Sequence, residues 1–170
     1  EVLAPAGDIE RLKWAFHYGA DAVYIGGMEY SLRANSTNFT TEEIKSAVKY
    51  AHNINKKIYV TVNMILRNED LNGLDRYLKK LDKIGVDALI VSDMAVIEAH
   101  NRLKLNVPIH ISTQDSITNK YAVKFFEKLG ATRVVLAREC SKDDIKEIKE
   151  NTKAELEVFI HGAMCTSYSG

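Results

Sequence analysis

The sequence predicts an α/β protein, a parallel TIM-like (β/α) barrel that is incomplete, with about seven strands and six helices. Short apolar segments alternate with amphipathic segments along the whole chain. Several apolar segments are nearly continuous, as in parallel strands buried on both faces. An open doubly wound sheet is the alternative. It is disfavoured because Ala4-Pro5-Ala6-Gly7-Asp8, after the first predicted strand, has one glycine where a dinucleotide-binding fingerprint has three.

The predicted strands are short segments rich in Val, Ile and Tyr. Their spacing along the chain leaves room for one helix between each pair, as a run of βα units requires. They are Val2–Ala4, Ala22–Ile25, Ile58–Val62, Ala88–Val91, Ile109–Ser112, Arg133–Ala137 and Leu156–Ile160.

The segments between the strands have apolar residues at the helical spacing i, i+3, i+4 and i+7, with Lys and Glu on the opposite face. The stripes are Ile44, Ala47, Val48 and Ala51; Ala122, Phe125, Phe126 and Leu129; Leu71, Leu74, Leu78 and Leu81; and the shorter Ile9, Leu12 and Phe16. We therefore expect amphipathic helices that cover the sheet.

Start and stop signals agree with these helices. Thr40 with Glu43 is a predicted capping box, and Ser141 with Asp144 is a weaker one. Gly19, Gly85 and Gly130 stand at positions where a helix ends in a left-handed conformation. Each glycine opens one of three similar segments, Gly19–Ile25, Gly85–Val91 and Gly130–Leu136, which precede the second, fourth and sixth strands. A doubled βαβα unit explains that repeat.

Composition limits the classes of function. The chain has 170 residues, which suits one domain, and 23 basic residues balance 23 acidic ones. A net charge of zero gives no overall attraction to nucleic acid or to an anionic membrane, although a local basic patch stays possible. No apolar run approaches the ~18 residues of a membrane span. We expect a cytoplasmic protein with no membrane partner, whose two cysteines are free thiols or metal ligands.

In a βα barrel, chemistry takes place at the C-terminal ends of the strands. The polar residues expected there, or in the long loop after the second strand, are Arg33, Asn63, His110, Gln114, Arg138 and His161, and we predict that they bind substrate. Several have structural alternatives. Arg33 could bind a carboxylate or phosphate or lie in solvent, Asn63 could bond loop backbone, and His110 could be a hydrogen-bonded core residue. Asp93 fits a helix N-cap.

The catalytic residues cannot be assigned from motifs. The sequence has no nucleophile elbow, no zinc-binding H-E-x-x-H helix and no phosphate-binding P-loop. A cysteine protease would need the Cys165 thiolate near a histidine. His161 is close in sequence, but at the end of a strand residues i and i+4 need not meet in space.

The segment Glu157–Gly170 resembles the signature of peptidase family U32, E-x-F-x-x-G-[SA]-M-C followed by four residues and a glycine. The chain ends before the second cysteine of that pattern. The opening Leu3–Asp8 and three further segments are similar to the family in the same order, so the resemblance covers the whole chain. Those segments are Gly19–Gly27, Ser31–Ala34 and Val135–Glu139. Together with a first residue that is Glu1 and not Met, this leads us to expect a barrel-like N-terminal domain over residues 1–170 of a larger protein.

The resemblance implies a function and a cofactor. The family is known as collagenase-like proteases, while better-understood relatives hydroxylate tRNA wobble uridine, ribosomal RNA cytidine or a ubiquinone precursor, with prephenate as oxygen donor in the RNA and quinone pathways. In those relatives the signature cysteines bind a 4Fe–4S cluster. Carried over, Cys165 is a metal ligand and Cys140, which has no counterpart in the motif, packs. One cysteine does not hold a cubane cluster, so we expect none, and little activity, in residues 1–170 alone.

Three functions of different classes therefore stand as hypotheses. The first is an iron–sulfur-dependent RNA hydroxylation enzyme whose full-length form binds tRNA and prephenate. The second is a peptidase, and the third is a non-catalytic partner subunit. An incomplete barrel exposes apolar strand edges, so we also expect a homo- or hetero-oligomer.

Overall fold

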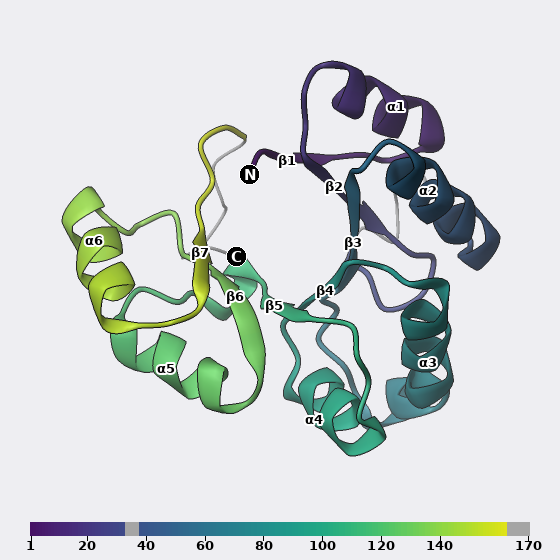
Figure 1. Ribbon diagram of the computed structural model, residues 1–170. Helices are drawn as coiled ribbons and strands as arrows, with labels where there is room; N and C mark the ends of the chain where they lie inside the picture. The colour runs from purple at the N-terminus through teal and green to yellow at the C-terminus, as the bar shows by residue number, and fades with distance from the viewer. Residues whose placement is uncertain (33–37, 163–170) are drawn as a thin grey trace. The chain divides into compact units, whose positions relative to one another are not determined.

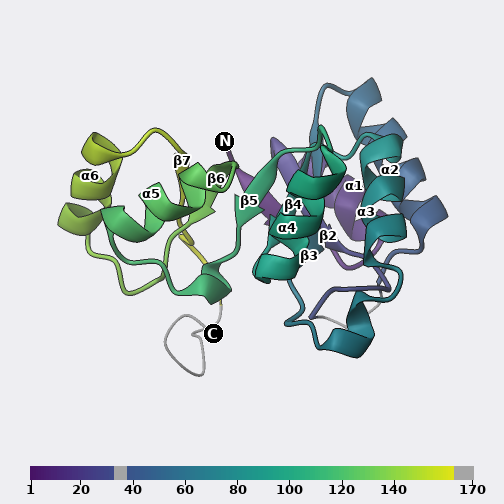
Figure 2. The ribbon, with the colours of Figure 1, turned by 90° about the horizontal axis from the view of Figure 1, so that it is seen from below.

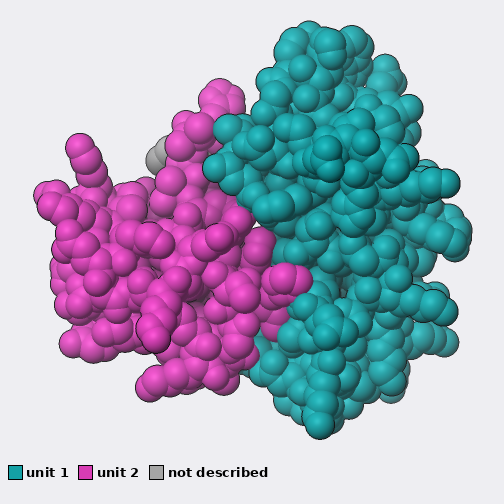
Figure 3. Space-filling view, viewed as in Figure 1, with its two compact units in different colours: residues 1–107 teal, residues 108–170 magenta. Residues whose placement is uncertain are grey.

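The computed structural model describes residues 1–32 and 38–162. The chain divides into two compact units, Glu1–Val107 and Pro108–Gly170, which Figure 3 shows in two colours. Each unit is a run of βα repeats with its own parallel strands.

The first unit has four parallel strands, and each strand pairs with the strand that follows it in the chain. Four α-helices lie along the outer side of these strands (Figure 1). The strands are β1 (Leu3–Pro5), β2 (Ala22–Gly26), β3 (Lys57–Val62) and β4 (Ala88–Val91). The helices are α1 (Ile9–His17), α2 (Thr41–Asn53), α3 (Leu74–Ile84) and α4 (Met94–Leu103), and a 3₁₀ turn, η1, spans Asn68–Leu71.

The second unit has three parallel strands, β5 (Ile109–Ile111), β6 (Ala131–Val135) and β7 (Glu155–Glu157), again paired in chain order. Its helices are α5 (Lys120–Lys128) and α6 (Lys142–Asn151), and a short 3₁₀ turn, η2, spans Thr113–Asp115. Figures 1 and 2 both show α5 and α6 side by side, where Lys120 Nζ lies 2.7 Å from Glu147 Oε1.

The predicted fold class is confirmed. The described residues form seven parallel strands and six α-helices in alternation, and the strand order within each unit follows the chain, as in a TIM-like fold. The predicted helix ends are confirmed as well. Thr40 and Glu43 cap α2 reciprocally, Ser141 and Asp144 cap α6, and the carboxylate of Asp93 accepts the backbone N–H of Ala95 at the start of α4.

The predicted end of the seventh strand is wrong. We expected Leu156–Ile160, but β7 ends at Glu157, and Val158, Phe159 and Ile160 are exposed. The neighbouring strand is also shorter than predicted, because β6 ends at Val135. Leu136 N–H still donates to Glu157 at 2.9 Å, and Ala137 N–H, which points to the opposite side, donates to Ile117.

The core forms where the helical stripes predict it. Ile44, Ala47, Val48 and Ala51 are all buried under α2. Three stripe residues are exceptions. Ile9 is exposed at the start of α1, Leu71 belongs to η1 and is exposed, and Phe125 faces solvent while Val123 is buried instead. None of the helices in the described part of the chain has the length and apolar character that crossing a bilayer requires.

Candidate active site at the strand ends

The ends of β2 and β3 are joined by a chain of buried hydroxyl groups. Thr61 Oγ1 donates to the carbonyl of Ile25 at 3.3 Å and shares a 2.9 Å hydrogen bond with Ser31 Oγ. Since Thr61 uses its own hydrogen on Ile25, Ser31 is the donor between the two. Both side chains are buried. The hydrogen bonds fix the start of the loop after β2 against the end of β3.

Asn63, a predicted substrate-binding residue, also serves this loop. Its Oδ1 accepts the backbone N–H of Leu32 at 3.4 Å, while the next residue, Met64, donates its N–H to Tyr30 at 3.1 Å. The structure therefore gives Asn63 a loop-positioning contact, which was the structural alternative for this residue. Its side chain stays partly exposed at the strand end.

A buried tyrosine fills the space beside the glycine pair at the end of β2. A Cβ atom on Gly27 would lie 2.1 Å from Tyr77 Oη, so only glycine fits there. Tyr77 is 3% exposed, and among the described residues its hydroxyl has no hydrogen-bond partner. Burial raises the pKa of Tyr77, so the phenol stays neutral. The ring of Tyr30 packs against it with a centroid distance of 5.2 Å.

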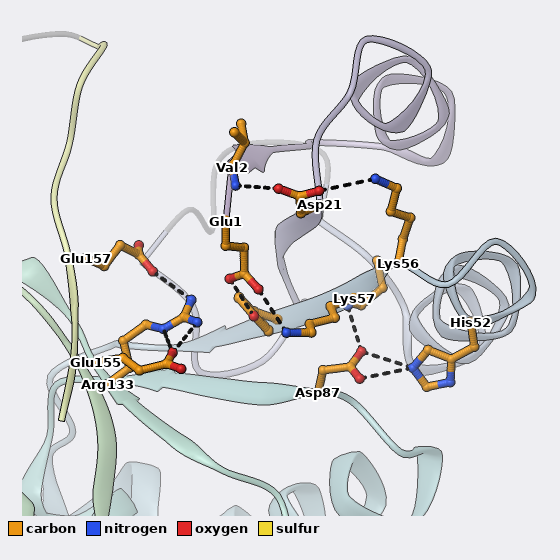
Figure 4. A network of polar contacts seen from close by, with 12 residues as sticks. Glu1, Val2, Asp21, His52, Lys56, Lys57, Asp87, Arg133, Glu155 and Glu157 are labelled. Carbon is orange, nitrogen blue, oxygen red and sulfur yellow. Dashed lines mark hydrogen bonds and ion pairs between the residues drawn. The ribbon is translucent and has the colours of Figure 1, made fainter. Parts of the chain in front are cut away.

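A charged row crosses the strands of the second unit. His110, Arg133 and Glu155 are register partners on β5, β6 and β7, so their side chains lie on one face of these strands. His110 is buried, as expected for a side chain opposite to Ile109 and Ile111. Figure 4 shows the Arg133 guanidinium between two carboxylates: Nε lies 2.9 Å from Glu155 Oε2, and Nη1 lies 3.3 Å from Glu157 Oε2.

The end of β6 carries a second guanidinium. Arg138 lies over the ring of Phe159, with its Cζ 4.4 Å from the ring centroid, in cation–π geometry. A Cβ on Gly162 would lie 3.7 Å from Arg138 Nη2, so the Arg138 side chain reaches the residue that follows His161. His161 itself is exposed, and Gln114 lies in η2. A guanidinium held at a strand end can bind a carboxylate or a phosphate.

Two predicted residues, Arg33 and Cys165, lie outside the described residues. Within residues 1–32 and 38–162 no three His, Cys, Asp or Glu side chains are placed to hold a metal ion. Cys140 is partly buried, and its thiol donates to the carbonyl of Ile117 at 3.7 Å. Burial, and then the charges of Asp144 and Glu139, raise the pKa of this thiol.

Sequence reasoning missed two features of the site. The contact between Gly27 and Tyr77 joins positions far apart in the chain, and no local pattern could indicate it. The charged row could have been predicted from the sequence. Glu155 and Glu157 are two residues apart on one strand, so their side chains lie on the same face, and Arg133 is a charged residue within an otherwise apolar strand.

Comparison with known proteins identifies the family. The family model described as "Peptidase family U32" matches residues 7–170. The tRNA hydroxylation protein P1 of Bacillus subtilis is 53% identical over 170 residues, which is 100% of this chain and 40% of that protein. An uncharacterized protease of Methanocaldococcus jannaschii is 45% identical over 175 residues, 100% of this chain and 42% of that protein. The chain thus spans less than half the length of these relatives.

A solved structure supports the same fold. The structure of a U32 peptidase matches with a TM-score of 0.77 at 15% identity, covering 93% of this chain and 67% of that one. At this identity the likeness concerns the fold alone. The family itself rests on the match over residues 7–170, and the chain belongs to peptidase family U32.

Proposed function

We propose that the protein takes part in RNA hydroxylation, with the wobble uridine of tRNA as substrate. The observation that carries this proposal is the 53% identity, over all 170 residues, to a protein named for tRNA hydroxylation. Because the chain spans 40% of that relative, the activity is proposed for the whole protein that contains it.

The polar groups at the strand ends suit substrate binding better than peptide hydrolysis. Ser31 donates its hydrogen to Thr61, so it has no base to activate it as a nucleophile. The thiol of Cys140 has a raised pKa and is bonded to a backbone carbonyl, which disfavours the reactive thiolate. Arg138, held over Phe159, offers a guanidinium for an anionic group such as a phosphate or a carboxylate, and prephenate, the proposed oxygen donor, carries carboxylates.

The cofactor in this proposal is a 4Fe–4S cluster with Cys165 as one of its thiolate ligands. What supports this proposal is the resemblance of Glu157–Gly170 to the family signature, whose cysteines bind the cluster in the hydroxylating relatives. When bound, the cluster supplies one-electron redox chemistry. The residues of this chain would then bind and orient the substrate.

Deletion of the gene, followed by mass spectrometry of nucleosides from purified tRNA, tests the function. We expect the hydroxylated wobble uridine to disappear and to return when the parent gene is supplied, but not when the Cys165→Ala variant is supplied. The Cys140→Ala variant is the matched control and should restore the modification. Unchanged tRNA in the deletion strain would refute the proposal.

The family name favours a second candidate, a peptidase. Purified full-length protein incubated with gelatin or casein would test it. Cleavage that the Cys165→Ser variant abolishes would support the peptidase, and absence of cleavage together with loss of tRNA hydroxylation in the deletion strain would exclude it as the main activity.

A further inference from the structure

Helix α5 turns two aromatic rings toward solvent. Tyr121 is 73% exposed and Phe125 is 54% exposed, although both lie on a helix of a βα repeat, whose apolar residues normally face the sheet. They are spaced i and i+4, so their Cβ atoms are about 5–6 Å apart along one side of the helix. The side that packs inward is formed by Val123 and Phe126 instead.

Two lysines occupy the same outward side. At 100° per residue, Lys124 and Lys128 fall beside Tyr121 and Phe125 and opposite to the buried Val123. Neither lysine has an ion-pair partner among the described residues. We call Tyr121, Lys124, Phe125 and Lys128 the α5 face.

Acidic side chains of the neighbourhood are used elsewhere. Glu127 points away from the α5 face, and its Oε1 accepts the backbone N–H groups of Lys153 at 2.6 Å and Ala154 at 2.7 Å. Glu147 of α6 is paired with Lys120, at the beginning of α5. The α5 face therefore combines exposed rings with two uncompensated positive charges and carries no acid of its own.

Helix α1 offers a contrast within the same chain. Trp14 and Tyr18 are also exposed and stack on each other with a centroid distance of 5.9 Å. Glu10, however, lies one turn before Trp14, Arg11 pairs with Asp8, and Lys13 lies over the ring of Tyr50 at 5.5 Å. Both helices thus carry exposed aromatic rings. On α1 an acid lies one turn from Trp14 and the nearby Lys13 lies over another ring, whereas on α5 two lysines without an ion-pair partner among the described residues accompany the rings.

We propose that the α5 face binds a single-stranded segment of RNA. Bases stack on exposed aromatic rings whatever their sequence, and lysines beside the rings contact the phosphates of the same strand. The positive charge of the α5 face is complementary to this polyanion. The choice of RNA as occupant rests on the proposed function, whereas the face itself is independent of the chemistry at the strand ends.

Direct binding measurements test the proposal in the full-length protein. Fluorescence anisotropy with a labelled oligouridylate, and with unmodified bulk tRNA, gives the affinity. Replacing Tyr121→Ser and Phe125→Ser should weaken binding by about five- to 150-fold per ring, the range found for base–aromatic stacking. Replacing Lys124→Gln and Lys128→Gln should reduce the slope of log K against log salt by about 1.4, since each phosphate contact on a single strand contributes about 0.7.

The matched control replaces Trp14→Ser and Tyr18→Ser on α1, which should leave RNA affinity unchanged. Affinity and salt slope equal to the parent's in both α5 variants would overturn the proposal. So would light scattering in which the Tyr121→Ser, Phe125→Ser variant turns a dimer into a monomer without loss of RNA affinity, because the α5 face would then bind a second copy of the chain. Loss of RNA affinity in the α5 variants, in a protein whose deletion leaves tRNA hydroxylation unchanged, would support the α5 face and refute only the proposed function.

Discussion

Asp87 and Ile58 hold each other through two hydrogen bonds. The Asp87 backbone N–H donates to the Ile58 carbonyl at 2.9 Å, and the Asp87 carboxylate accepts the Ile58 N–H at 2.8 Å. Asp21 and Val2 make the same pair of bonds, at 2.9 Å and 2.8 Å. Asp21 and Asp87 are equivalent positions of the repeated segments, so each repeat fastens the start of an even-numbered strand to the strand before it. In the third repeat Thr132 stands there, and its hydroxyl donates to the Ile109 carbonyl at 3.1 Å.

Replacing Asp87→Ala should destabilise the first unit. The Ile58 N–H is partly buried and would lose its acceptor, which costs about 1–3 kcal/mol. Urea denaturation followed by circular dichroism measures the change. The control is Asp143→Ala. Asp143 is an exposed residue in the first turn of α6, so its replacement should lower the free energy of unfolding by less than about 1 kcal/mol. Equal losses of unfolding free energy in the two variants would show that the Asp87 hydrogen bonds stabilise the fold no more than an exposed acidic residue does.

Acid should weaken the same contact at Asp21. The hydrogen bond from the Val2 backbone, and secondarily Lys56, lower the pKa of Asp21 below its ordinary value of 3.8. A carboxyl group with a lowered folded-state pKa stabilises the fold above its unfolded pKa, and this stability is lost as pH falls through the folded pKa. Melting temperatures measured from neutral pH down through the range below about 4 should therefore fall less steeply in Asp21→Asn than in the parent. Parallel curves would contradict this assignment.

Gly27 and Tyr77 should be coupled. Gly27→Ala places a methyl group 2.1 Å from the Tyr77 hydroxyl, and overpacking of this kind costs about 1–3 kcal/mol. Tyr77→Phe removes the hydroxyl, and because that group has no hydrogen-bond partner among the described residues, the change alone should be nearly neutral. In the double variant the methyl group meets the ring carbon at 3.4 Å, so most of the loss should be recovered. A double-mutant cycle from urea denaturation measures the coupling, and additive effects would show that the backbone moves instead.

Local signals predicted the elements that local physics decides. The capping boxes of α2 and α6 and the buried stripe of Ile44, Ala47, Val48 and Ala51 follow from spacing within one segment. The parallel strands follow from the alternation of apolar and amphipathic segments along the chain. The end of β7 does not, because Val158–Ile160 has the residues of a strand and lacks a partner strand beside it. Phe125 likewise fits an apolar stripe that the sheet does not contact.

The candidate site was predicted in part for the same reason. Residues at strand ends can be found once the strands are known, and Asn63, His110, Gln114 and Arg138 do lie at or near those ends. Their partners cannot be found in this way, because Asn63 meets a loop backbone and Arg138 meets the ring of Phe159. Such contacts depend on tertiary packing and not on spacing.

The two cysteines should behave oppositely toward iron. A thiolate is the ligand that an iron–sulfur cluster requires, and the raised pKa of Cys140 and its hydrogen bond to Ile117 keep this thiol protonated. Cys165, by contrast, is the proposed ligand. Anaerobic reconstitution of the full-length protein with iron and sulfide should give the broad visible absorbance of a thiolate-bound cluster, together with bound iron measured by elemental analysis. Cys165→Ala should abolish both signals, and Cys140→Ala should leave both intact. Reconstitution of the two variants to the level of the parent would mean that Cys165 is not a ligand. The hydroxylation proposal would then lose the support of its proposed cofactor.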